Sequence, residues 1–265
     1  MSKNPLQYAL VAGGSKGIGY AIAEALAKRK FNLILIGRNS QTLQSARTQL
    51  KAKYEVEVET LALDLGLDDS PEKISQWCSE KQIPLKILCN VAGLGGAKDF
   101  LSLPVSGLRD MIKLNIGSEM ALCLSLLPIL EKNAPSYILN VSSLAGFAPI
   151  PVKNLYSATK SAIIFFSYAL NYQLKKKNIS VSCLCPGPVF SKPEIKKETE
   201  EKLGWLGLLM AAEPEKVGEI AVRRTLNKRL IIVPGLLPKI ISVLLRIVPR
   251  RLLVFIYYKA ANEKN

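Results

Sequence analysis

The stretch YALVAGGSKGIGYAIA, Tyr8 to Ala23, decides the fold of this chain. Its first five residues form an apolar run of strand length, and its last residues open a helical pattern. Between these two parts, Gly13, Gly17 and Gly19 follow a G-x-x-x-G-x-G spacing. A glycine-rich turn that joins a strand directly to a helix is typical of α/β folds that bind dinucleotides, because a helix N-terminus attracts phosphate groups.

We expect this turn to hold a dinucleotide cofactor. Gly13 and Gly17 would let the phosphates approach backbone N–H groups, and Gly19 would let the helix pack closely on the strand. The cofactor-binding residues assigned here are Gly13, Ser15, Lys16, Gly17, Ile18 and Gly19. The alternative interpretation of the motif taken alone is a glycine-rich turn without a ligand.

Short apolar runs alternate with stretches of helical length and spacing downstream of this turn. The expected strands are residues 8–12, 32–36, 56–63, 86–89, 136–141, 180–184 and 230–233. The expected helices are residues 18–29, 41–53, 71–80, 108–130, 156–177 and 214–227. This alternation predicts a Rossmann-like α/β fold with a doubly wound parallel sheet. We expect one domain over residues 1–235, followed by a helical C-terminal extension over residues 236–265.

The composition excludes several kinds of site. The chain of 265 residues contains no histidine, so His-based triads and His-containing zinc sites are excluded, and we expect no metal site. Its five cysteines include no C-x-x-C pair, which is typical of a reducing compartment and leads us to expect a cytoplasmic protein. A net charge of +15 favours anionic partners, but no nucleic-acid-binding motif accompanies it, and we expect no nucleic acid partner.

The end of the second expected strand indicates which dinucleotide is bound. An NAD-selective site places a carboxylate there, but this chain has Arg38 after Ile36 and Gly37. Arg38 can pair with a 2′-phosphate, and Lys16 adds a second positive charge nearby. If the glycine turn binds a dinucleotide, the sequence therefore predicts a preference for NADP(H).

Candidate catalytic side chains follow the fifth expected strand. Tyr156 and Lys160 are four residues apart, so they share one face of a helix. A phenol is a weak acid-base catalyst at neutral pH, and a neighbouring ammonium group assists it by stabilising the phenolate. Ser143 could hold the substrate oxygen by a hydrogen bond. Taken alone, Y-x-x-x-K is common on amphipathic helices.

Taken together, the motifs resemble those of the short-chain dehydrogenase/reductase family. The resemblance runs from about Tyr8 to Gly235 and includes, in one order, the glycine turn, Asp64-Leu65, Asn90-Val91-Ala92-Gly93, Asn115, Ser143, Tyr156-x-x-x-Lys160 and Pro186-Gly187-Pro188-Val189. It implies a Rossmann-like fold and an NADP(H)-dependent oxidoreductase that acts on a ketone or alcohol.

The resemblance also implies a role for each matching residue. Tyr156 would protonate the carbonyl oxygen, Lys160 would bind the nicotinamide ribose and assist Tyr156, and Ser143 would orient the carbonyl. Asn115 would anchor a water in a proton relay. The remaining implied cofactor contacts are Asp64 and Leu65 at the adenine, Asn90, Ala92 and Gly93 in the cleft, and Pro186, Gly187, Val189 and Ser191 at the nicotinamide.

Three positions depart from the family pattern. Val91 replaces an asparagine of the usual Asn-Asn-Ala-Gly, Ser191 replaces a common threonine, and Ala12 stands where the family has threonine before Gly13. None of them alters the expected proton donor. Val91 removes a polar side chain from the expected cofactor cleft.

The C-terminal tail has its own pattern. Pro238 and Pro249 predict one or two amphipathic helices, in which Lys239, Ser242 and Arg246 form a narrow polar stripe beside a broad apolar face. An acidic membrane surface, a dimer interface and a lid over an acyl pocket would each require such a face. The segment is too short to cross a bilayer.

The function expected from the whole sequence is an NADPH-dependent carbonyl reductase, reversibly an alcohol dehydrogenase, for a lipophilic ketone such as a 3-oxoacyl thioester. The alternative is a non-catalytic NADP(H)-sensing or scaffolding protein on the same fold, which would typically lack the Tyr156 and Lys160 retained here. We expect a homo-dimer or homo-tetramer, with peripheral membrane contact through the tail as a further partner.

Overall fold

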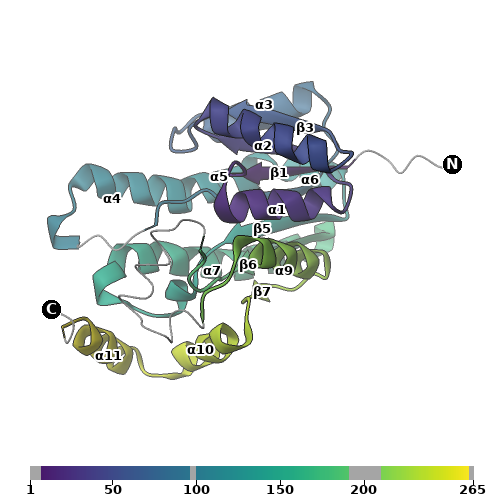
Figure 1. Ribbon diagram of the computed structural model, residues 1–265. Coiled ribbons are helices and arrows are strands. Elements are labelled where there is room, and N and C mark those ends of the chain that lie inside the picture. The colour runs from purple at the N-terminus through teal and green to yellow at the C-terminus, as the bar shows by residue number, and fades with distance from the viewer. Residues whose placement is uncertain (1–6, 96–99, 191–209, 263–265) are drawn as a thin grey trace.

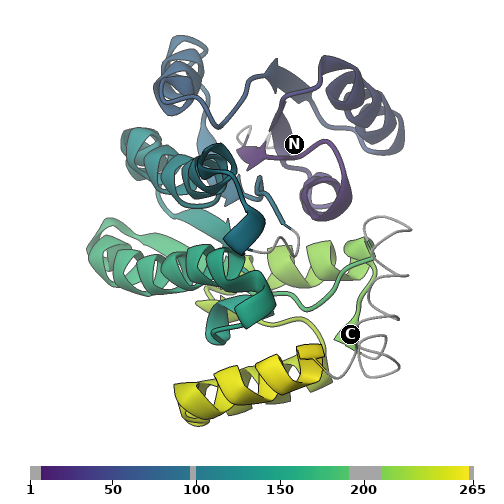
Figure 2. The ribbon, with the colours of Figure 1, turned by 90° about the vertical axis from the view of Figure 1, so that its left-hand side faces the viewer.

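The computed structural model describes residues 7–95, 100–190 and 210–262, which build a seven-stranded parallel sheet between two layers of helices (Figures 1 and 2). The strands are β1 (Tyr8–Ala12), β2 (Asn32–Gly37), β3 (Val58–Ala62), β4 (Leu85–Asn90), β5 (Ser136–Val141), β6 (Ile179–Leu184) and β7 (Ile231–Ile232). Their order in the sheet is β3-β2-β1-β4-β5-β6-β7. This is the doubly wound arrangement expected from the sequence, and its switch point lies between β1 and β4.

Helices cover both faces of the sheet, because alternate strand residues are apolar on each side. Ala9 and Val11 face one layer, formed by α1 (Gly17–Ala27), α2 (Ser40–Lys53) and α9 (Pro214–Leu226). Leu10 and Ala12 face the other layer. That layer contains α3 (Ser70–Glu80), α5 (Ser118–Ser125), α6 (Leu127–Lys132) and α7 (Asn154–Leu174). The remaining segments are α4 (Val105–Ile112), the π-helical turn η2 (Lys113–Gly117), and the short 3₁₀ turns η1 (Phe100–Ser102), η3 (Leu144–Phe147), η4 (Pro151–Lys153) and η5 (Lys175–Lys177).

The single helix expected over residues 108–130 is wrong. The segment is divided into α4, the π turn η2, α5 and α6. Pro128 lies in the first turn of α6, where its missing N–H breaks no helical hydrogen bond, so a new helix begins there. The strand expected over residues 56–63 is shorter, and β7 contains two residues where four were expected.

Two C-terminal helices, α10 (Leu236–Ile247) and α11 (Arg250–Asn262), follow β7. They pack on η3 and η4 around an apolar cluster that includes Leu245 and Leu253 (Figure 1). The polar stripe expected on α10 does not face solvent as a whole, because Ser242 is buried and donates to the carbonyl of Lys239 at 2.8 Å. Within the described part of the chain, no helix has the length and hydropathy needed to span a membrane.

Candidate active site

The glycine turn is fixed by backbone contacts within the protein. Gly13 has a φ of +90°, and a Cβ placed on it would lie 2.8 Å from the backbone nitrogen of Ala92. A Cβ on Gly19 would lie 2.0 Å from the carbonyl oxygen of Gly13, so α1 packs directly against the turn. The close contact of Gly19 is thus with the turn itself, whereas a contact with the strand was expected. Glycine was expected at position 13 so that phosphate groups could approach the backbone. The short distance to Ala92, just after β4, requires glycine at this position as well.

The N-terminus of α1 has the chemistry of a phosphate site. Lys16 precedes the helix with extended backbone, and no side chain caps the helix there. The first N–H groups of a helix have no partner within the helix, and their positive partial charge favours an anion. The turn and the open helix end therefore fit the diphosphate of a dinucleotide.

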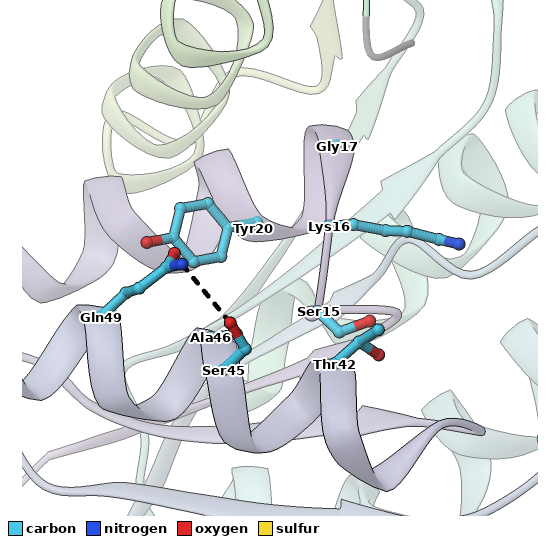
Figure 3. A pocket seen from close by; sticks show the side chains of 8 residues that line it. All are labelled: Ser15, Lys16, Gly17, Tyr20, Thr42, Ser45, Ala46 and Gln49. Atoms are coloured by element: carbon cyan, nitrogen blue, oxygen red, sulfur yellow. Dashed lines mark hydrogen bonds between the residues drawn. The ribbon is translucent and has the colours of Figure 1, made fainter.

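A hollow of about 310 Å³ lies beside this turn, between α1 and α2 (Figure 3). It is lined by Ser15, Lys16, Gly17, Tyr20, Thr42, Ser45, Ala46 and Gln49. Figure 3 shows Ser15 and Thr42 close to each other at one end of the hollow, while the Lys16 side chain extends away from Tyr20 and Gln49. The hollow is therefore at the expected phosphate and adenosine end of the cofactor.

Arg38 lies at the same end. A Cβ on Gly37, the residue before it, would be 3.5 Å from Ser15 Oγ, which places the end of β2 beside the glycine turn. The Arg38 side chain is exposed and forms no ion pair with any residue that the structure describes. It is thus available to an anionic group next to the turn, as the NADP(H) assignment requires.

The end of β4 connects the glycine turn with the expected catalytic residues. The carbonyl of Ala12 accepts hydrogen bonds from the N–H groups of Val91 and Ala92 at 2.9 and 2.8 Å. A Cβ on Gly93 would lie 3.1 Å from Asn115 Oδ1 and 3.5 Å from Lys160 Nζ. Val91, which departs from the family pattern, packs against an apolar cluster of the core.

Two of the expected cofactor residues are buried, and a third forms a local hydrogen bond at the surface. Asn90 is buried and donates to Asn140 Oδ1 at 3.0 Å, so its side chain ties the end of β4 to the end of β5. Leu65 is a buried core residue. Asp64 is exposed, and its carboxylate accepts a hydrogen bond from the N–H of Gly66 at 2.9 Å.

Asn115 sits on the π turn η2, where the extra residue aims its side chain toward α7. The amide accepts from the N–H of Leu94 at 2.7 Å, and donates to the carbonyl of Leu94 at 2.9 Å and to Thr159 Oγ1 at 3.2 Å. The Asn115 side chain therefore joins the segment after Gly93 to the helix that carries Tyr156 and Lys160.

Lys160 is a buried cation at the centre of the site. Its Nζ donates to the carbonyl of Val141 at 2.7 Å, and Ser142 Oγ donates to the carbonyl of Lys160 at 2.6 Å. These bonds hold α7 against the end of β5. Tyr156 is half-buried one turn earlier, on the face of α7 that Lys160 occupies.

Ser143 lies two residues after the end of β5 and is half-buried. Its hydroxyl oxygen accepts a hydrogen bond from the N–H of Ala145 at 3.2 Å. The hydroxyl proton is then free to be donated to a substrate oxygen.

The segment from Pro186 to Val189, expected at the nicotinamide, lies at the same edge of the sheet as Ser143. The carbonyl of Pro186 accepts from the N–H of Leu144 at 2.9 Å, which ties it to the turn after Ser143. A Cβ on Gly187 would lie 3.0 Å from the carbonyl oxygen of Met210, and Val189 is buried. Ser191, also expected at the nicotinamide, lies outside the described residues.

Sequence reasoning missed Glu119, a buried carboxyl group behind the site. Neither of its carboxyl oxygens has a hydrogen-bond partner among the described residues. Burial raises the pKa of Glu119 well above its ordinary value, and the positive charge of Lys160 acts in the opposite direction. Its position four residues after Asn115 was the available signal, because it places an acid on the helix face that carries a site residue.

The comparisons with known proteins decide the family. The model of the short chain dehydrogenase family matches residues 7–203. The chain belongs to this family. The very-long-chain 3-oxoacyl-CoA reductase of Mus musculus is 35% identical over 201 residues, which cover 74% of this chain and 64% of that relative. The chain therefore matches less than two thirds of the length of this relative.

Solved structures of the short-chain dehydrogenase family share the fold. A short-chain dehydrogenase from Sphingobium yanoikuyae in complex with NADPH has a TM-score of 0.77 at 27% identity, with coverage of 87% of this chain and 88% of that one. A 7beta-hydroxysteroid dehydrogenase has a TM-score of 0.84 at 18% identity, with 95% and 96% of the two chains covered. The second likeness bears on the fold alone.

Proposed function

We propose that this short-chain dehydrogenase is an NADPH-dependent carbonyl reductase, reversibly an alcohol dehydrogenase, that acts on a 3-oxoacyl thioester. The observation that carries the proposal is that Asn115 and Lys160 both lie beside Gly93, with Tyr156 one turn before Lys160 on α7. Ser143 lies two residues after the end of β5. A non-catalytic NADP(H)-binding protein would not need a buried lysine held one turn from a half-buried tyrosine.

The cofactor would be held by the glycine turn and the N-terminus of α1 at its diphosphate, and by Lys160 and the segment from Pro186 to Val189 at its nicotinamide end. When bound, reduced nicotinamide supplies a hydride to the carbonyl carbon of the substrate.

The protein's own residues supply the proton and the orientation. The Ser143 hydroxyl donates a hydrogen bond to the substrate carbonyl oxygen, which fixes the position of that oxygen. The Tyr156 hydroxyl gives its proton to the same oxygen as the alcohol forms. The Lys160 ammonium stabilises the resulting phenolate by its positive charge. Asn115 positions these groups, because its amide ties α7 to the segment after Gly93.

We propose NADP(H) as the preferred cofactor. Arg38 is an exposed cation at the end of β2, where a carboxylate would favour NAD, and Lys16 adds positive charge beside the same hollow. The NADPH complex of the Sphingobium yanoikuyae relative supports this assignment.

The substrate class is supported by the relatives. The Mus musculus relative is a very-long-chain 3-oxoacyl-CoA reductase, and the net charge of +15 favours an anionic thioester such as one of coenzyme A. The test is a panel of 3-oxoacyl-CoA substrates of increasing chain length, with steroid and sugar ketones as comparison, followed by loss of NADPH absorbance. We expect turnover of the 3-oxoacyl-CoA substrates. NADPH binding without turnover of any ketone would favour the non-catalytic alternative.

We also propose that the chain forms a homo-oligomer through the outer faces of α5 and α7. Phe165, Tyr168 and Tyr172 form an exposed apolar stripe on α7, and Leu124 is exposed on α5, which packs on the same face of the sheet. A two-fold axis could bring such a stripe against its own copy.

A further inference from the structure

The two C-terminal helices expose an unusually large share of the apolar surface. Ten of the twenty large apolar side chains that are exposed among the described residues lie between residues 236 and 258. We call them the C-terminal apolar face: Leu236, Ile240, Val243, Leu244, Ile247, Leu252, Val254, Phe255, Ile256 and Tyr258. Apolar patches of this kind on a protein surface mark sites of contact with a partner or a membrane.

The exposed apolar side chains of α10 are arranged for contact with a flat surface. On α10 they recur at positions 236, 240, 243, 244 and 247, which is one face of a helix. The opposite side of α10 contacts the body of the protein through Leu245, and α11 does so through Leu253. The apolar face therefore points away from the body of the protein.

The helices are held in this orientation by specific contacts. Arg250 donates hydrogen bonds to the carbonyls of Phe147 and Leu245 at 2.6 and 2.9 Å. The guanidinium of Arg246 lies 4.3 Å from the centre of the Phe147 ring. Because Phe147 ends η3, the C-terminal apolar face has a fixed position relative to the turn that follows Ser143.

The charge of the two helices indicates the chemistry of the partner. Residues 236–262 contain five Lys or Arg and no Asp or Glu. Lys239 on α10 and Arg251 on α11 are exposed beside the apolar residues. A second copy of the chain bound through the same face would bring like charges together across the two-fold axis. An anionic lipid surface would accept both the apolar side chains and the positive charges.

We propose that the C-terminal apolar face binds an anionic membrane, with α10 and α11 lying in the plane of the lipid surface. The helices are on the side of the molecule where η3 and η4 lie, between Ser143 and Tyr156 in the chain (Figures 1 and 2). Membrane contact would thus bring the entrance of the active site close to lipid acyl chains. Only this last consequence rests on the proposed function.

The test is sedimentation with vesicles of phosphatidylcholine, alone or with 30% phosphatidylglycerol, at low and high salt. We expect the protein to bind the anionic vesicles and binding to weaken with salt. Ile247→Ser with Phe255→Ser should lower the partition coefficient at least ~10-fold, since both side chains are more than half exposed in the free protein. Leu67→Ser with Val105→Ser removes two exposed apolar side chains elsewhere and should change it less than twofold.

A second pair of substitutions tests the charges separately. Lys239→Glu with Arg251→Glu should reduce binding more than ~10-fold at low salt, because each basic residue near an anionic surface contributes roughly fivefold. This pair leaves the apolar face intact, so it tests the proposal even where the serine pair folds poorly. Binding requires no turnover, so its outcome is separate from that of the reductase assay.

Two results would overturn the proposal. One is an unmodified protein that does not sediment with anionic vesicles at low salt. The other is a change of mass in analytical ultracentrifugation when Ile247 and Phe255 are replaced, with vesicle binding unchanged, which would assign the face to contact between copies.

Discussion

Arg38 is a single exposed side chain on which the proposed choice of cofactor depends. Arg38→Asp removes the partner of the 2′-phosphate and adds a repulsive charge, so the Kd for NADPH should rise at least ~10-fold while the Kd for NADH changes little. Fluorescence titration with both cofactors measures this. Arg109→Asp, the same change at an exposed position of α4, is the control. Equal weakening for NADPH and NADH would show that another residue selects the cofactor.

Glu119 predicts how stability depends on pH. Its pKa is raised by burial, so the folded protein keeps a proton that the unfolded chain releases above a pH of about 4.3. The free energy of unfolding should therefore fall as the pH rises above that value, until the pKa of the folded state has been passed.

The Glu119→Leu variant tests this account. Replacing an unpartnered buried carboxyl group should raise the free energy of unfolding at pH 8 by about 1–3 kcal/mol and flatten its pH dependence. Urea unfolding across pH 5 to 8 measures both effects. Glu215→Leu, at an exposed position of α9, should leave the pH dependence as it is. A loss of stability in Glu119→Leu at pH 8 would mean that the carboxylate is ionised and stabilising.

For single residues, the sequence indicates which side chains belong to the site better than it indicates what those side chains contact. Tyr156, Lys160 and Ser143 could be selected because their chemistry and spacing are informative. The burial of Asn90 and its hydrogen bond to Asn140 could not be predicted, because that contact joins residues 50 positions apart. Glu119 was missed for a similar reason, since its surroundings come from several separate elements.

Among the elements, the turn between β1 and α1 gives the sharpest stability prediction. A Cβ at position 19 would overlap the carbonyl oxygen of Gly13, so Gly19→Ala must shift α1 or the turn. We expect a loss of about 1–3 kcal/mol in the free energy of unfolding and weaker NADPH binding. Urea unfolding and cofactor titration measure the two effects. Gly95→Ala is the control, because a Cβ there meets no described residue within 4 Å, and equal effects at both sites would contradict the packing described here.

The strands and most helices were predictable because their apolar spacing is local and the sheet imposes alternation on it. The division of residues 108–130 was not predictable in full. Its π turn places Asn115 against Leu94 and Thr159, and those contacts depend on the folded arrangement of three segments. Likewise, the pattern of α10 predicted an apolar face but not that this face would be exposed.

For the whole molecule, the exposed stripe on α7 predicts assembly. Phe165→Asp should convert the oligomer to a monomer, because a charge would be buried in the contact that the stripe makes with its copy. Sedimentation velocity measures the mass, and Leu67→Asp, at an exposed site before α3, is the control. A wild-type protein that is monomeric at micromolar concentration, or an oligomer that survives Phe165→Asp, would contradict this interface.

The central claim is that Tyr156 donates a proton during NADPH-dependent ketone reduction. Its most direct test is the initial rate of NADPH loss with a 3-oxoacyl-CoA substrate in the wild-type protein and in Tyr156→Phe, with Tyr168→Phe on the same helix as the control. The account predicts turnover in the wild type and in Tyr168→Phe. In Tyr156→Phe it predicts a loss of at least ~10²-fold in kcat, with NADPH binding retained. A Tyr156→Phe variant that reduces the substrate at the wild-type rate would contradict it.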